Sequence, residues 1–229
     1  MKKNMLALAL ALTFSGTLPI VQAENAVADG NSSAGKEKSA SCAGCHGEDG
    51  NSMMPTFPKL AQQNTAYLVR QLAAFKDGSR NAPAMAPMAL ALSETDMADI
   101  AAYFASQPVS ANPEPLLPTD DNAEEEVDEA KAKEIMKTLL VQGSNLYRNG
   151  NLTSEVSACI ACHGPSGEGN KPAGFPALRS QHPDYLIKTL TDFKTGARSK
   201  NSDNMMVMIA KKMTEEEIKA VSYAISTMH

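Results

Sequence analysis

Two copies of one five-residue pattern hold all four cysteines of the chain. The pattern is Cys-x-x-Cys-His, and it ends at His46 in the first half and at His163 in the second. Two thiols at this spacing can form thioether bonds with the vinyl groups of a porphyrin, while the next residue offers its imidazole to the iron. The pattern therefore predicts two covalently bound haem c groups, with His46 and His163 as iron ligands. The predicted attachment residues are Cys42, Cys45, Cys159 and Cys162.

Other uses of the same residues fit the sequence less well. A redox-active Cys-x-x-Cys is typical of a βαβ setting, which the sequence lacks. A structural zinc site needs four ligands, whereas each copy of the pattern offers two cysteines and one histidine. A disulfide across each pair would leave a small domain short of a core, because the chain has only 5% aromatic residues and no tryptophan. A porphyrin inside each domain would supply the missing apolar contacts.

The second axial ligand decides whether the iron is closed or open to small molecules. An open site permits peroxide or oxygen chemistry, whereas a methionine thioether closes the site and leaves electron transfer. Ser93 and Thr214 stand at equivalent positions, at the start of the last predicted helix of each half. Eight residues before them stand Met85 and Met206. No other position in this stretch holds methionine in both copies, so these two are the predicted second iron ligands.

The segments on either side of residues 108–130 are copies of each other, which is the mark of an internal repeat. Besides the cysteine pattern, Phe57 to Leu60 returns as Phe175 to Leu178, and Phe75 to Arg80 returns as Phe193 to Arg198. The order of the motifs is kept and the gaps between them are nearly equal. The repeat therefore predicts two domains of one fold. Arg80 and Arg198 close matching loops, where they are either partners of haem propionates or solvated loop ends.

The elements that must position these residues read as helices. Each repeat ends with a capping-box pattern, Ser93 to Asp96 and Thr214 to Glu217, followed by apolar residues at helical spacing. A middle helix is predicted before the arginine loop of each repeat, and residues 129–148 predict a helix that leads into the second cysteine pattern. No alternating run is long enough to predict a strand. We therefore predict an all-α fold of two tandem helical domains, each wrapped around a covalently attached haem.

The ends and the middle of the chain have distinct compositions. Lys2 and Lys3 precede a short apolar stretch and a small-residue cleavage pattern at Val21 to Ala23, which predicts a signal peptide and export to an oxidising compartment. Residues 108–130 are rich in proline and carry 8 acidic and no basic side chains, which predicts an extended, solvated linker. The predicted boundaries are 1–23 for the signal peptide, 24–107 for domain 1, 108–130 for the linker and 131–229 for domain 2.

Charge differs between the two predicted domains. Residues 24–107 carry 9 acidic and 6 basic side chains, whereas residues 131–229 carry 9 acidic and 13 basic ones. The chain as a whole is acidic, with a formal net charge of −5. This balance does not indicate nucleic-acid binding.

In these motifs the chain resembles the di-haem cytochrome c4 family, a tandem of two class I cytochrome c domains. The resemblance covers nearly the whole chain after the predicted signal peptide, except the acidic linker. In class I cytochromes the carbonyl of the proline in the Pro-x-Leu motif accepts a hydrogen bond from Nδ1 of the ligand histidine. The resemblance assigns this role to Pro58 and Pro176.

The resemblance implies an electron carrier and not an enzyme. It implies a periplasmic protein that takes electrons from an upstream donor and passes them toward a membrane terminal oxidase, and association with the membrane surface is compatible with this. Two alternatives stay open: the cytochrome subunit of a dehydrogenase complex, and a di-haem peroxidase. A methionine at the same position in both copies argues against the peroxidase.

Overall fold

The computed structural model describes residues 30–117, 128–199 and 204–229, so the predicted signal peptide lies outside the described residues. Within these ranges the chain forms helices and two isolated β-bridges but no strand, which confirms the all-α prediction. The helices are α1 Ser32–Lys38, α2 Ala43–His46, α3 Thr65–Lys76, α4 Ala86–Leu90, α5 Glu94–Ser106, α6 Glu129–Asn149, α7 Ile160–His163, α8 Pro183–Thr195, α9 Asn204–Ala210 and α10 Glu215–Ser226. One 3₁₀ turn, η1, spans Ala40–Cys42. No described helix is long and apolar enough to cross a membrane.

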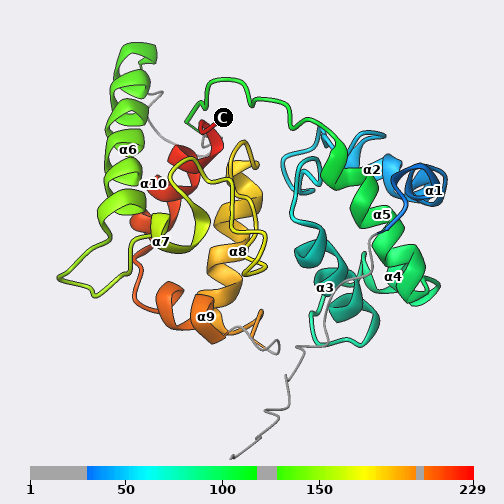
Figure 1. Cartoon of the computed structure of the whole chain (residues 1–229). Coiled ribbons are helices and arrows are strands. Elements are labelled where there is room, and N and C mark those ends of the chain that lie inside the picture. The colour runs from blue at the N-terminus through cyan, green and yellow to red at the C-terminus, as the bar shows by residue number, and fades with distance from the viewer. Residues whose placement is uncertain (1–29, 118–127, 200–203) are drawn as a thin grey trace, which may run out of the picture.

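The helices form two bodies that lie side by side (Figure 1). Helices α1 to α5 form domain 1, and α6 to α10 form domain 2. The apolar core of domain 1 centres on α5, where Phe104 is 1% exposed. The core of domain 2 centres on α10 and includes the fully buried Tyr147 of α6. Both tandem helical domains of the prediction are therefore present.

The first and last helices of each domain cross at very close range. In domain 1 a Cβ added at Gly35 of α1 would lie 1.9 Å from the carbonyl oxygen of Asp99 in α5. In domain 2 a Cβ added at Gly143 of α6 would lie 2.0 Å from the carbonyl oxygen of Ala220 in α10. Only glycine leaves room for backbones that approach so closely. The same crossing, built twice, anchors the segment that leads to each cysteine pattern.

The capping boxes predicted at Ser93 and Thr214 are both formed. Each hydroxyl accepts a hydrogen bond from the backbone N–H three residues later, and the carboxylate of that residue accepts from the backbone N–H of the cap. These bonds satisfy backbone donors that a helix start otherwise leaves free. The last helix of each domain therefore starts where the sequence predicts.

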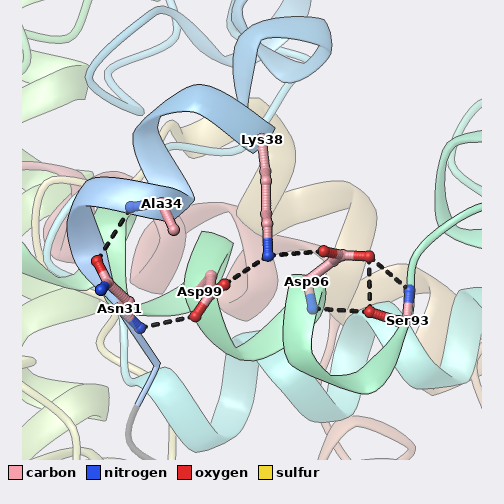
Figure 2. A network of polar contacts seen from close by, with 6 residues as sticks. All are labelled: Asn31, Ala34, Lys38, Ser93, Asp96 and Asp99. Atoms are coloured by element: carbon pink, nitrogen blue, oxygen red, sulfur yellow. Dashed lines mark hydrogen bonds and ion pairs between the residues drawn. The ribbon is translucent and has the colours of Figure 1, made fainter.

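A polar bridge joins α1 and α5 in domain 1 (Figure 2). The Nζ of Lys38 lies 2.7 Å from a carboxylate oxygen of Asp96 and 2.5 Å from one of Asp99. Asp99 also accepts a hydrogen bond from the backbone N–H of Asn31. Counted from the crossing glycines, Leu146 takes the place of Lys38 in domain 2, where the same contact is apolar.

The segment between the domains is partly bound rather than solvated as predicted. Residues 108–117 form no helix, but the side-chain amide of Asn112 donates to the backbone carbonyls of Ser180, Gln181 and Ser226 in domain 2. Helix α6 begins at Glu129, so the last two residues of the predicted linker are helical. The prolines prevent a helix in the first part but leave its carbonyls and side chains free to contact both domains. The acidic residues 118–127 lie outside the described part of the chain.

The domains contact each other through matching glutamines. The side chain of Gln63 exchanges two hydrogen bonds with the backbone of Ala177, both of 2.8 Å. Gln181 does the same with the backbone of Lys59, at 2.8 and 3.0 Å. Each glutamine follows the Pro-x-Leu motif of its own domain and binds the backbone just after the motif proline of the other. The interface is therefore close to two-fold symmetric.

Candidate haem sites

The two pattern histidines are buried and held by the prolines of the same domain. His46 is 5% exposed and His163 is 7% exposed. Nδ1 of each ring lies 2.9 Å from a proline carbonyl, of Pro58 in domain 1 and of Pro176 in domain 2. A carbonyl only accepts, so Nδ1 carries the hydrogen and Nε2 keeps its lone pair. Burial lowers the pKa of both histidines, which favours the neutral ring that a metal requires.

The short turns that carry these histidines also hold the four cysteines, none of which forms a disulfide. Cys45 is exposed, and the others are half-buried. Burial raises the pKa of Cys42, and raises that of Cys159 to about 11. A redox-active dithiol needs a thiol pKa below its ordinary value, so these environments are unlike those of a disulfide oxidoreductase.

Burial separates the predicted ligand methionines from their neighbours. Met85 is half-buried at the start of α4, whereas Met88 in the same helix is 40% exposed. Met206 is half-buried on α9 and packs against the same core cluster as Cys159. The methionines on either side of Met206 that could compete with it are more exposed. They are Met205, at 49%, and Met208, at 66%.

Arg80 and Arg198 are brought together at the domain interface. Arg80 stacks on Phe75 of its own domain and donates to the phenol oxygen of Tyr185, across the interface, at 3.1 Å. Arg198 does the reverse, donating to Tyr67 at 3.0 Å. Both arginines are half-buried, so neither is the solvated loop end that the sequence left open.

One neutral side chain lies between the two arginines. The Oε1 atom of Gln71 accepts from Nη1 of Arg80 at 2.6 Å and from Nη2 of Arg198 at 2.8 Å. The two guanidinium groups repel each other, because like charges that share one acceptor atom lie close together. In the described ranges, no carboxylate forms an ion pair with either guanidinium. The pair therefore calls for an anion from outside the described protein atoms.

These donor sets fit haem c. Each domain offers free thiols for thioether bonds, a neutral imidazole with its Nε2 lone pair available, and a half-buried thioether. The two arginines supply cations for propionates, which are anionic at neutral pH. The chemistry of every group in the set matches what the porphyrin and its iron require.

Sequence reasoning missed two features of the interface. Gln71 carries no motif, and its partners come from both domains, so no local pattern could reveal it. His182 is the N-cap residue of α8 and is only 9% exposed. Its Nε2 lies 2.9 Å from both the hydroxyl and the carbonyl oxygen of Ser52 in domain 1. The only sequence pattern that could have indicated the interface is the presence of glutamine at matching positions of the two repeats, Gln63 and Gln181.

The chain is similar in sequence and in fold to known cytochromes. The cytochrome c family profile matches residues 32–108 and 140–228. Cytochrome c4 of Pseudomonas aeruginosa is 40% identical over the full length of both chains. The crystal structure of reduced recombinant cytochrome c4 from Pseudomonas stutzeri matches with a TM-score of 0.75 and 39% identity, over 87% of this chain and 100% of that one. A Stutzerimonas stutzeri protein named thiosulfate dehydrogenase electron acceptor is 33% identical, over 79% of this chain and 76% of its own.

Two cytochrome c domains in one chain, each with its own attachment pattern, define a di-haem cytochrome c. The chain belongs to the cytochrome c family, and within that family to the cytochromes c4. Its cofactors are two haem c groups. It is an electron carrier and not an enzyme.

Proposed function

We propose that this protein carries electrons through the periplasm from an upstream donor to a membrane terminal oxidase. The signal-peptide pattern of residues 1–23 supports export. The observation that carries the proposal is the pairing of two buried sites, one per domain, across one interface of direct hydrogen bonds. Such a molecule accepts electrons on one domain and releases them from the other without changing a substrate.

Each site combines two residues that would bind iron with a proline that orients the histidine ring. His46 and Met85 would hold the haem iron in domain 1, and His163 and Met206 would hold it in domain 2. The carbonyls of the motif prolines, 2.9 Å from Nδ1, fix the ring orientation and increase the electron density on Nε2. Haem iron, once bound, supplies a one-electron couple. With a histidine and a methionine as ligands, each iron would be closed to small molecules, and electron transfer would be the remaining chemistry.

The arginines complete both sites from the interface. We assign Arg80 and Arg198 as propionate partners, because both are half-buried and neither has a described carboxylate in ion-pair contact. Their hydrogen bonds to Tyr185 and Tyr67 keep each guanidinium at the junction of the domains.

A second candidate has support from one relative. The Stutzerimonas stutzeri protein is named as the electron acceptor of thiosulfate dehydrogenase, and it shares 33% identity with this chain. A dehydrogenase would then be the donor to this protein, in place of another upstream donor. Both candidates use the same two sites and differ only in the partner.

A redox titration of the purified holoprotein tests the function. We expect reduced-minus-oxidised spectra of c-type haem, two one-electron waves, and no rapid binding of carbon monoxide by the reduced protein. Fast carbon monoxide binding would show an open iron and favour the peroxidase. Stopped-flow mixing with membranes that contain the terminal oxidase then tests the acceptor, and mixing with thiosulfate dehydrogenase and thiosulfate tests the donor. Reoxidation by the membranes supports the oxidase, and reduction by the dehydrogenase supports the second candidate.

A further inference from the structure

The hydrogen bonds between the domains converge on one buried side chain. Gln71 lies on α3 and is 7% exposed. Its Oε1 atom is the shared acceptor for the guanidinium of its own domain, Arg80, and for that of the other domain, Arg198. We call these three residues the interdomain node.

The node departs from the symmetry of the interface around it. The arginine–tyrosine contacts are exchanged reciprocally between the domains, as are the glutamine–backbone contacts. In the repeat, however, the position of Gln71 is taken by Thr189, which is not a partner of either arginine in the described contacts. A single residue of domain 1 therefore positions a cation from each domain.

The interdomain node is electropositive, and its charge lowers the pKa of the neighbouring Tyr185. Burial alone would raise the pKa of Tyr185, yet the charges of Arg80 and Arg198 bring it below its ordinary value. The two cations act on Tyr185 together although they come from different domains. A charge placed at the node is therefore felt on both sides of the interface.

We propose that Gln71 is a positioning residue that holds both arginines at one node, so that charge at this node sets the potentials of the two haems together. This inference rests on the proposed function, because it requires a haem in each domain. Reduction adds a negative charge to a haem, which a nearby cation favours and a nearby anion opposes. A node shared by the domains must therefore shift both potentials in the same direction.

The test compares Gln71→Glu with Ala73→Glu. The first places a carboxylate on the node, and the second places the same charge at an exposed position of the same helix, where water and salt screen it. We expect Gln71→Glu to move both redox waves of the holoprotein to lower potential by comparable amounts, and Ala73→Glu to move neither. A shift of one wave only, or equal shifts in both variants, would overturn the proposal.

A second variant removes a cation instead of adding an anion. Arg80→Gln takes one charge of domain 1 from the node, and we expect it to lower both waves, including that of the haem in domain 2. A change confined to the haem of domain 1 contradicts a shared node. Thermal unfolding of the same proteins tests whether Gln71 only stabilises the fold. A lower melting temperature in Gln71→Glu, with both redox potentials unchanged, would also overturn the proposal.

The redox waves separate a failure of the proposed function from a failure of the interdomain node. If the unmutated protein lacks two one-electron waves, the proposed function fails before any variant is made. If it shows two waves and Gln71→Glu moves only one of them, the function stands and the node is wrong.

Discussion

Each pattern histidine has one ring nitrogen committed to a proline carbonyl, which leaves the other free for iron. The opposite side of the iron is assigned to Met85 and Met206, the half-buried members of their methionine groups. Removing either thioether opens one iron while the other stays closed. We expect Met85→Ala and Met206→Ala each to lose about half of the weak red absorption band of methionine-ligated ferric haem, and to bind carbon monoxide at one haem per molecule.

Met88→Ala and Met208→Ala are the matched controls for this prediction. Both residues are exposed neighbours of the assigned ligands, at 40% and 66%. The controls should keep the full band and stay closed to carbon monoxide. Loss of the band in Met208→Ala and its retention in Met206→Ala would move the ligand assignment of domain 2 to Met208, two residues further along α9.

Residues whose partners lie in the same repeat could be predicted from the sequence, because spacing along the chain determines their geometry. The capping box of Ser93 with Asp96 is of this kind, whereas the contact of His46 with Pro58 was expected only from the resemblance to the cytochromes c4. Gln71 and His182 could not be predicted, since each has a partner in the other domain. Where two folded surfaces meet depends on the shape of both, which no local pattern encodes.

At the scale of elements, α1 is held on α5 by Lys38, whose ammonium group bridges two carboxylates (Figure 2). The Asp99 side chain is only 8% exposed, so Lys38→Met leaves a nearly buried carboxylate without its cation. We expect this variant to lower the unfolding midpoint of the holoprotein at pH 7. Lys133→Met, which breaks an exposed ion pair on α6 with Glu129, should leave the midpoint unchanged.

The loss of stability in Lys38→Met should depend on pH and become smaller in acid. The hydrogen bond from Lys38 is the main reason that the pKa values of Asp96 and Asp99 lie below their ordinary value of 3.8. Their contribution to stability is full above that value and is lost as the pH falls through the lower values of the folded protein. The difference in unfolding midpoint between Lys38→Met and the unmutated protein should therefore become smaller below about pH 4. A gap that stays constant from pH 7 to pH 3 would show that lost packing, not charge, causes the effect.

The helices themselves were largely predictable, and the reason is local. Capping boxes and apolar spacing define α5 and α10 without reference to anything else in the fold. Helix α1 was not predicted, because its seven residues carry little apolar pattern and depend on the glycine crossing with α5. The bound state of residues 108–117 was also missed, since their composition describes an isolated chain and not one lying between two surfaces.

At the scale of the whole molecule, His182 connects the domains through Ser52. Burial is the main reason that its pKa lies below the ordinary value of 6.5, and the charge of Lys59 acts in the same direction, whereas Ser52 and Asp184 oppose it. The folded protein therefore resists a proton that the unfolded chain accepts, so stability falls as the pH drops below 6.5. We expect His182→Asn, which copies Asn64 of domain 1, to flatten the decline in melting temperature between pH 7.5 and pH 5.

His229→Asn is the control for this experiment, because His229 is exposed at the chain end. It should reproduce the pH profile of the unmutated protein. An unchanged profile in His182→Asn would assign the acid sensitivity of the holoprotein to groups outside this contact.

Two electrostatic influences act on the haems of the whole molecule, and they have different consequences. The interdomain node acts on both haems and shifts them together. The uneven surface charge acts on them differently: residues 24–107 carry three more acids than bases, residues 108–130 carry 8 acids, and residues 131–229 carry four more bases than acids. A unit charge about 10 Å away in water contributes about 0.4 kcal/mol before screening. Several such charges separate the two potentials by tens of millivolts, on the order of 1 kcal/mol.

We therefore expect the haem attached at Cys159 and Cys162 to have the higher potential, because a positive surrounding favours the added electron. Met85→His and Met206→His each lower one haem, and so assign the two waves in a titration. The separation between the waves should shrink as ionic strength rises, since salt screens the surface charges. Finding the higher wave on the haem of domain 1, at a position that salt does not move, would show that burial and hydrogen bonding around the irons outweigh the charge of the surface.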